Sequence, residues 1–348
     1  MNGVSDALLA AFEVQSNACA RLGSQFSSDL LIRAKSDATS DGPVRALVMP
    51  WQEASFEEVN SAAVPLRLLA AIHALVLRGD EPELSAAYPP NKMDVDQDWS
   101  LVRNALRRRQ TYCADFMSHE PQTNEVRRSL CLLGGFLEVA HKTQLPLRCF
   151  ELGASAGLNT LWDHFYYQFG NHEWGPPSST VKLSCEWSGA VPQIQTPVVV
   201  EGRFACDRRP VELKNRQEQF RLMAYIWPDQ LDRLERLRAA IALAQQDQGL
   251  LVESADAHVW AERAVPREGC ATILFHSVMW QYLRTDYQLR LKHVIDGLGQ
   301  SATESAPFAW LRMEPGSPKF EVRLTLWPGG DDRLLAVVHP HGAWVKWL

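Results

Sequence analysis

LRCFELGASAGLN, residues 147–159, is the stretch of sequence that decides the fold. Its first six residues are mostly apolar and predict a short buried strand. The small residues from Gly153 to Gly157 then predict a tight turn. The residues that follow, LNTLWDHFYYQF (158–169), predict a helix. A strand, a glycine-rich turn and a helix together are typical of a sheet that binds a ligand at the ends of its strands.

Downstream of this unit, apolar segments alternate with helical ones. Further strands are expected over residues 181–187, 250–255, 271–277 and 308–314, and helices over residues 211–226, 229–246 and 281–295. Such alternation predicts a Rossmann-like, mostly parallel sheet with helices on both faces. The segments FEVRLTLW and RLLAVVH, which flank PGGDD, predict an antiparallel C-terminal hairpin that AWVKW (343–347) can extend.

Upstream of the stretch, the sequence predicts only helices. They are expected in a segment capped by Ser5 and over residues 56–77, 98–117 and 124–141. We therefore expect an all-helical N-terminal domain over residues 1–145 and an α/β domain over residues 146–348.

The composition is that of a folded protein. The 348 residues are 46% apolar and 22% charged, with a formal net charge of −6. These values exclude a disordered chain and a strongly basic nucleic-acid binder, and the acidic balance disfavours duplex nucleic acid as a partner. The 12 tryptophans are concentrated after residue 147, which favours an aromatic-walled pocket or a bulky core.

The cysteines and the apolar segments give indications of the cellular compartment of the protein. The seven cysteines are scattered without a CxxC pair, which predicts reduced thiols, a cytoplasmic protein and no structural zinc. His339 and His341 are only weak evidence for a metal, so none is expected. The start of the chain has no basic region typical of a signal peptide, and Arg67 and His73 interrupt the most apolar segment, so no membrane span is expected. The oligomeric state is left open.

The glycine-rich turn matches a cofactor site. In methyltransferases that bind S-adenosylmethionine, an acid at the strand end precedes a G-x-G-x-G turn, because the ligand carries an ammonium group. Glu151 stands at the position of that acid, and Ser155 replaces the middle glycine. Free N–H groups at the start of the following helix would also suit a nucleotide or a carboxylate. The expected cofactor-binding residues of this segment are Glu151, Gly153, Ala154, Ser155, Gly157 and Asn159.

The same turn matches a second motif. Residues 153–157 read as G-x-S-x-G, the nucleophile elbow of a serine hydrolase, with Ser155 as the nucleophile. His339 or His341 could complete a catalytic triad, but no acid is clearly placed and no oxyanion loop precedes the turn.

Acidic residues at later strand ends extend the cofactor hypothesis. Glu186 either accepts hydrogen bonds from ribose hydroxyls or is a solvated strand end. Asp256, followed by Ala257, is expected near the adenine amino group, and it can also cap a helix. Asp207 either caps a helix that begins near Pro210 or faces the cleft.

A histidine follows the strand that should border the reacting groups. His276 is the candidate general base or substrate contact, with a satisfied structural histidine as the alternative. Trp280 and Tyr282 are the candidate substrate-binding residues, and they could equally belong to the core.

Several segments together resemble a known family. ELGASAGLN, CDRRPVEL, AYIWPDQLDRLERLRAA, FHSVMWQYL and LWPGGDDRLLAVVHPHGAWVKW resemble an uncharacterised bacterial family, a domain of unknown function, over nearly the whole chain. That family is similar in fold to class I S-adenosylmethionine-dependent methyltransferases. The resemblance implies that fold, S-adenosylmethionine as cofactor and Asp256 as the acid on the adenine side. No Asp-Pro-Pro-Tyr or Asn-Pro-Pro-Tyr signature follows the strand 271–277, which argues against adenine-N6 or glutamine as the acceptor.

Three functions follow as expectations. The first is an S-adenosylmethionine-dependent methyltransferase that acts on a small-molecule or protein acceptor, with the helical domain as a lid. The second is a non-catalytic protein of the same fold that binds the cofactor or a partner. The third is the serine hydrolase. The segment AYIWPDQ has no role that the sequence assigns.

Overall fold

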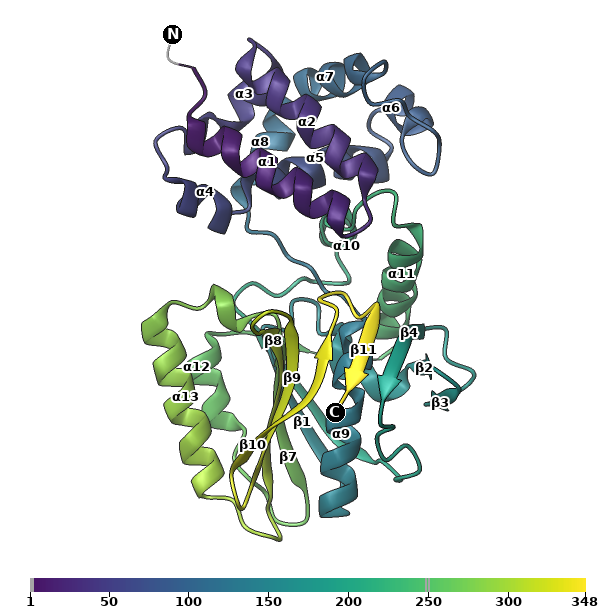
Figure 1. The fold of residues 1–348 in the computed structure, drawn as a ribbon, viewed down its shortest axis with the longest axis vertical. Helices are drawn as coiled ribbons and strands as arrows, with labels where there is room; N and C mark the ends of the chain where they lie inside the picture. The colour runs from purple at the N-terminus through teal and green to yellow at the C-terminus, as the bar shows by residue number, and fades with distance from the viewer. Residues whose placement is uncertain (1–2, 248, 250) are drawn as a thin grey trace. The chain divides into compact units, whose positions relative to one another are not determined.

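The computed structural model describes residues 3–247, 249 and 251–348, and the chain forms two compact units (Figure 1). The helical unit contains Met1–Thr123 and Asn215–Glu235, and the α/β unit contains Asn124–Lys214 and Arg236–Leu348. This division differs from the expected one at residue 145. Residues 124–145 belong to the α/β unit, and the segment 215–235 belongs to the helical unit.

The helical unit is built from short helices. They are α1 (Asp6–Arg21), α2 (Gln25–Thr39), α3 (Pro43–Val48), α4 (Phe56–Ser61), α5 (Val64–Arg78), α6 (Pro82–Ala87), α7 (Trp99–Arg108), α8 (Gln110–Ser118) and α10 (Arg216–Ala224). Ser5 caps α1 as predicted, because its side chain accepts a hydrogen bond from Leu8 N. The helix predicted over 56–77 is broken by Ala63, whose φ is 51°, and the helix predicted over 98–117 is broken at Arg109.

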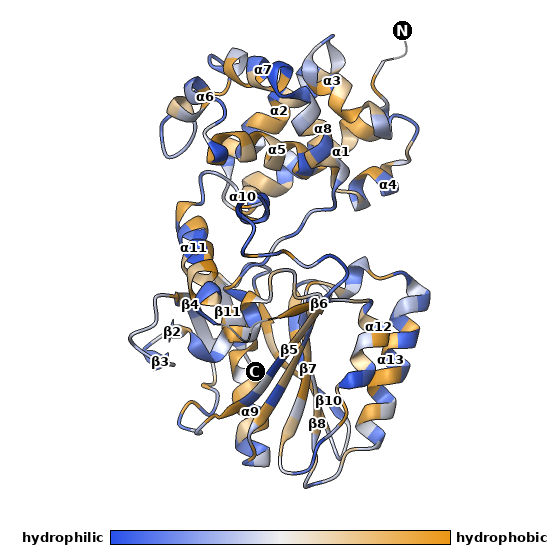
Figure 2. Ribbon diagram, turned by 180° about the vertical axis from the view of Figure 1, so that it is seen from behind, coloured by the Kyte–Doolittle hydropathy of each residue, from blue (hydrophilic) through white to orange (hydrophobic). Residues whose placement is uncertain are grey.

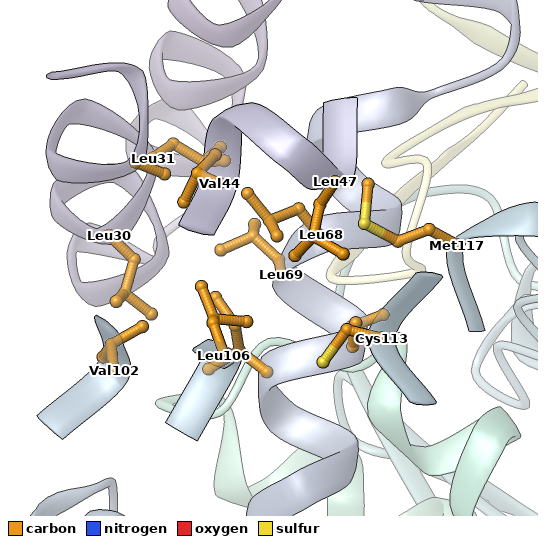
Figure 3. Close-up of a cluster of buried hydrophobic side chains, with 14 of the residues drawn as sticks. Leu30, Leu31, Val44, Leu47, Leu68, Leu69, Val102, Leu106, Cys113 and Met117 are labelled. Carbon is orange, nitrogen blue, oxygen red and sulfur yellow. The ribbon is translucent and has the colours of Figure 1, made fainter. Parts of the chain in front are cut away.

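Apolar side chains from these helices meet in one core, part of which Figure 3 shows. The labelled residues come from α2 (Leu30, Leu31), α3 (Val44, Leu47), α5 (Leu68, Leu69), α7 (Val102, Leu106) and α8 (Cys113, Met117). The helical stretch 56–78 is long and apolar enough to cross a membrane, but 67% of its most apolar window is buried within the protein. That burial is typical of the core helix of a globular protein.

The segment AYIWPDQ (224–230) attaches to this unit through buried polar contacts. His73 Nδ1 donates to the carbonyl oxygen of Ile226 at 2.9 Å and lies 3.3 Å from that of Ala224. The Asp229 carboxylate accepts hydrogen bonds from Ser24 Oγ at 2.5 Å and from Phe26 N at 3.3 Å, at the start of α2. The segment therefore has a structural role, which is to satisfy polar groups of the helical unit that would otherwise be buried without partners.

Within the described residues, the α/β unit is organised around an eleven-stranded sheet in the order β3-β2-β4-β11-β10-β9-β8-β7-β1-β5-β6. The strands are β1 (Leu147–Leu152), β2 (Tyr166–Phe169), β3 (His172–Trp174), β4 (Lys182–Gly189), β5 (Val200–Asp207), β6 (Val252–Ser254), β7 (Ala271–Ser277), β8 (Phe308–Pro315), β9 (Phe320–Trp327), β10 (Asp331–Val338) and β11 (Trp344–Trp347). Leu250, the first residue of the strand predicted over 250–255, lies outside the described residues.

Five of these strands form a parallel set in the order β6-β5-β1-β7-β8. Numbered along the chain, that order is 3-2-1-4-5, as in doubly wound folds. The order reverses between β1 and β7, and open α/β sheets bind ligands outside the carboxyl ends of their strands at such a point. β5 was not predicted, although VVVEGRFACD (198–207) carries strand-forming residues.

The remaining strands lie beyond β8. The predicted hairpin is confirmed as β9 and β10, and β11 extends it by pairing antiparallel with β10. The strand predicted over 181–187 exists as β4, but it pairs with β11 and β2 rather than with β1. The predicted helix over 158–169 is wrong. A 3-10 helix (Leu158–His164) leads into β2 instead.

Helices cover both faces of the parallel set, as predicted. Leu291 and Ile295 of α13 (Thr285–Gln300) and Trp260 of α12 (Ala257–Trp260) share a core with Phe150 and Leu152 of β1. α13 carries both hydrophilic and hydrophobic residues along its length (Figure 2). α11 (Leu231–Gln246) is close to its predicted bounds.

The other face carries α9 (Arg128–Thr143), which lies beside the strands in Figure 1. Gly134 and Gly135 allow this close approach, since a Cβ atom at either position would lie 2.3 Å from Trp347 or Leu311. Because α9 packs against the sheet, the segment that precedes β1 belongs to the α/β unit and not to the helical one.

Candidate functional site

The glycine-rich turn connects the end of β1 to the 3-10 helix. Gly153 and Gly157 have φ values of 63° and 74°, and Ser155 has a φ of 55°. Glycine adopts this left-handed region without strain, whereas a serine there is uncommon. The small residues of the turn thus follow from its backbone conformation.

The backbone N–H groups of the turn are already hydrogen-bonded. Ala154 N donates to Cys206 O at 3.0 Å, and Gly157 N donates to Ala154 O at 2.8 Å. Ala156 N and Leu158 N both donate to the buried Asn124 Oδ1 at 3.2 Å. The expected cradle for a phosphate or a carboxylate is therefore not formed, because these donors have acceptors within the protein. Sequence patterns give no signal for Asn124 as the residue that holds this turn.

Asp207 ties the turn to the neighbouring strand. β5 pairs with β1 so that Leu152 lies opposite Cys206, and Asp207 is the last residue of β5. Its Oδ2 accepts a hydrogen bond from Ser155 N at 2.8 Å, and its Oδ1 accepts one from Arg209 N at 2.8 Å. Of the two acids left open from sequence, Asp207 is the one that reaches the turn.

Glu151 is a buried acid beside Asp207. Glu151 is 2% exposed, and its Oε2 has no hydrogen-bond partner among the described residues. Burial raises the pKa of Glu151 well above its ordinary value, and the charge of Asp207 raises it further, while the backbone N–H of Thr160 acts in the opposite direction. A positively charged ligand group would satisfy Oε2 and stabilise the ionised carboxylate.

Ser155 lacks the partner that a nucleophile needs. Its Oγ is buried and makes no hydrogen bond within the described part of the chain. A serine nucleophile requires a base within hydrogen-bond reach of Oγ. The left-handed backbone of Ser155 suits an elbow, but the described residues place no base next to its hydroxyl.

Ala154 and Asn159 belong to the interior of the turn. Ala154 is buried, and Asn159 Oδ1 accepts a hydrogen bond from Ser129 Oγ at 2.7 Å. Asn159 Nδ2 lies 3.5 Å from the carbonyl oxygen of Glu125. Asn159 therefore fastens the start of the 3-10 helix to the segment that leads into α9.

The other predicted acids lie in different places. Glu186 is exposed on β4, which β11, β10, β9, β8 and β7 separate from β1, so the structure does not bring it to the turn. Asp256 is exposed at the start of α12, just after β6, and makes no side-chain capping bond there. Ala257, the first residue of α12, is half-buried. β6 neighbours β5, so Asp256 and Ala257 lie at the carboxyl end of the parallel set.

His276 is fully buried and both of its ring nitrogens are engaged. Trp310 Nε1 donates to His276 Nε2 at 3.1 Å, and His276 Nδ1 lies 2.7 Å from Glu314 Oε1. An indole N–H can only donate, so Nε2 is the acceptor and Nδ1–H donates to the carboxylate. The geometry of His276 is that of a satisfied structural histidine. Sequence reasoning missed its partner Glu314, which lies on β8.

Trp280 and Tyr282 follow β7. The Trp280 ring stacks on His276, with centroids 5.6 Å apart and planes at 17°, whereas Tyr282 is 72% exposed. Several other tryptophans are core residues. Trp162, for example, lies 4.1 Å from the Phe136 ring and 5.5 Å from the Trp174 ring. A bulky core thus accounts for much of the aromatic content after residue 147.

Thiols and metal ligands contribute little to the site. The seven cysteines are free thiols, and all except Cys185 are buried. Within the described residues, no group of three or more His, Cys, Asp or Glu side chains could hold a metal ion. The cytoplasmic location remains a prediction.

The acidic side chains at the turn fit a ligand that carries a cationic amino group. Glu151 Oε2 is an orphaned buried acceptor, and the Asp207 charge lies close to it. S-Adenosylmethionine carries an ammonium, a sulfonium and one carboxylate, so its net positive charge suits this pair of acids. A nucleotide phosphate would meet like charge, and the amides of residues 154–158 already donate to acceptors within the protein.

A family model matches residues 9–347 of the chain, and its description is an uncharacterized protein conserved in bacteria (DUF2332). No curated protein and no solved structure matches the chain.

Proposed function

The chain belongs to the bacterial family DUF2332, and we propose its function from the site itself. We propose that it is an S-adenosylmethionine-dependent methyltransferase that acts on a small-molecule or protein acceptor. The ligand would bind at the carboxyl ends of β1, β5 and β6, beside the point where the strand order reverses.

One observation carries this proposal: the buried Glu151 Oε2 has no partner in the described structure and lies beside a second acid, Asp207. An unsatisfied buried carboxylate destabilises the fold unless a cation compensates it. Glu151 would hold the ammonium group of the cofactor, and Asp207 would add negative charge while it fixes the turn. Asp256 would accept a hydrogen bond from the adenine amino group.

Methyl transfer requires little further chemistry from the residues of the protein. Bound S-adenosylmethionine supplies a methyl group that its sulfonium already activates. The chain then has to bind and orient the acceptor and exclude water. His276 does not serve as a base in this arrangement, because both ring nitrogens are hydrogen-bonded.

A second candidate function rests on the same observation about His276. A non-catalytic protein of this fold would bind the cofactor and need no proton acceptor at the end of β7. Methyl transfer from labelled S-adenosylmethionine to a panel of amines, alcohols, thiols and proteins separates the two candidates. Transfer to any acceptor supports the methyltransferase.

The test of the proposal is a thermal-shift titration with S-adenosylmethionine and S-adenosylhomocysteine. A ligand at 100 times its dissociation constant stabilises the folded state by about 2.7 kcal/mol. Glu151→Gln should abolish that shift, and Asp256→Ala should reduce it. 5′-Methylthioadenosine, which lacks the amino group, is the matched control, since its binding should not distinguish Glu151→Gln from the wild type. Absence of a shift with both cofactor forms would overturn the proposal.

A further inference from the structure

The segment that follows β7 covers the glycine-rich turn. Residues 278–284, which we name the β7–α13 loop, lead from β7 to α13. A Cβ atom placed on Gly153 would lie 2.9 Å from Met279 Cβ and 3.2 Å from its Cγ. The Met279 side chain therefore lies directly against Gly153. This contact closes the place where the strand order reverses, between β1 and β7.

The loop reaches this position through a strained backbone. Val278 has a φ of 54°, and a β-branched residue in the left-handed region is a genuine outlier. Such a conformation persists only where surrounding contacts hold it. One of these contacts is the hydrogen bond from Val278 N to Met313 O, at 2.8 Å.

Glu314 supplies the other contacts that hold the loop. Its Oε1 accepts hydrogen bonds from Met279 N at 3.0 Å and from Trp280 N at 3.2 Å. The same oxygen accepts the His276 Nδ1–H bond. The carboxylate thus acts as a clamp on two successive amides of the loop, and the Trp280 ring stacked on His276 adds a packing contact.

We propose that Met279 is a gate over the ligand site, which the clamp of Glu314 keeps closed. The inference rests on the function proposed above, since a ligand that approaches Gly153 needs the space that Met279 fills. Opening releases Val278 from its strained conformation. It also breaks the two hydrogen bonds that the backbone N–H groups of Met279 and Trp280 donate to Glu314. When only a fraction of molecules is open, the apparent affinity for ligand falls to that fraction of its intrinsic value. The gate therefore regulates access to the site.

The first test measures S-adenosylmethionine binding by calorimetry. Met279→Ala removes Cγ and the atoms beyond it, which lie against Gly153, and it should tighten binding about threefold or more, because less of the binding free energy is spent on opening. Met49→Ala, which changes an exposed methionine of the helical unit, is the matched control and should bind as the wild type does. If Met279→Ala binds S-adenosylmethionine with the affinity of the wild type, the gate is overturned and the proposed function stands. Absence of binding in every protein, the wild type included, would instead overturn the proposed function.

The second test needs no ligand. Glu314→Gln keeps the shape of the side chain and removes its charge, so amide exchange at Met279 and Trp280 should become at least tenfold faster while Ile273 and Leu274 in β7 stay protected. Unchanged protection at Met279 and Trp280 would overturn the clamp whatever binds to the site. Loss of protection throughout β7 would also contradict it, because Glu314 would then support the sheet rather than the loop.

Discussion

The carboxylate of Asp207 accepts a hydrogen bond of 2.8 Å from the backbone N–H of Ser155. This bond joins the end of β5 to the turn that follows β1, and it brings the charge of Asp207 close to Glu151. The same side chain thus shapes the turn and sets the electrostatics of the acid beside it.

Asp207→Ala should destabilise the α/β unit. It leaves Ser155 N and Arg209 N without their acceptor, and hydrogen bonds to charged groups contribute about 1.5–3 kcal/mol each. We expect the free energy of unfolding to fall by about 2–3 kcal/mol in urea titrations. Asp207→Asn keeps one acceptor oxygen, so its free energy of unfolding should fall less. A loss in Asp207→Ala no larger than that of a surface substitution would contradict this role.

Glu151→Gln should change how stability depends on pH. Burial and the charge of Asp207 raise the pKa of Glu151 above 4.5 in the folded state, so the folded state binds its proton more tightly than the unfolded state. The resulting stabilisation is fully present below pH 4.5 and is lost as pH rises toward the folded-state pKa. Glu151→Gln has no such loss, so its stability relative to the wild type should rise with pH, by up to about 1.4 kcal/mol per pH unit.

Urea unfolding of both proteins between about pH 5 and pH 9 measures this difference. Glu186→Gln is the matched control, because Glu186 is exposed and far from the turn in the sheet order. A constant difference between Glu151→Gln and the wild type across this range would disprove a raised pKa for Glu151.

Cofactor binding should release a proton. An ammonium group beside Glu151 favours the ionised carboxylate, whereas burial favours the protonated one. S-Adenosylmethionine should therefore bind more tightly as pH rises toward the folded-state pKa of Glu151, by up to about tenfold per pH unit. Calorimetry in buffers of different ionisation enthalpy measures the released proton. Binding without proton release would show that the ammonium group does not pair with a protonated Glu151.

His73→Phe should loosen the attachment of the segment 215–235 to the helical unit. The ring size is similar, but the carbonyl oxygens of Ala224 and Ile226 lose their buried donor. We expect the free energy of unfolding to fall by about 1–3 kcal/mol. Limited proteolysis should then cleave within this segment first. His119→Phe, at a half-buried histidine of the same unit, is the control that should leave the cleavage pattern unchanged.

Much of the fold could be predicted because its signals are local. The apolar runs of β1, β7 and β8, the turn between β9 and β10 and the periodic pattern of α11 depend on neighbouring residues alone. For two other segments the sequence pattern did not predict the observed structure. Residues 158–169 have helix-like spacing, but residues 166–169 pair in the sheet as β2, and the fully buried Trp162 stacks on Phe136 of α9. β5 carries Gly202 between Glu201 and Arg203, which weakened its signal as a strand.

The sequence by itself determined the turn after β1, since only small residues fit its left-handed positions, and it marked Glu151 and Asp207 as acids at strand ends. Tertiary structure alone decided which of these groups meet. The order of strands placed Asp207 rather than Glu186 beside the turn, the segment that precedes α9 brought Asn124 to its amides, and β8 brought Glu314 to His276 and the loop of Met279. The reason is physical: backbone conformation is set by near neighbours, whereas a buried carboxylate takes its pKa and its partners from residues distant in the chain.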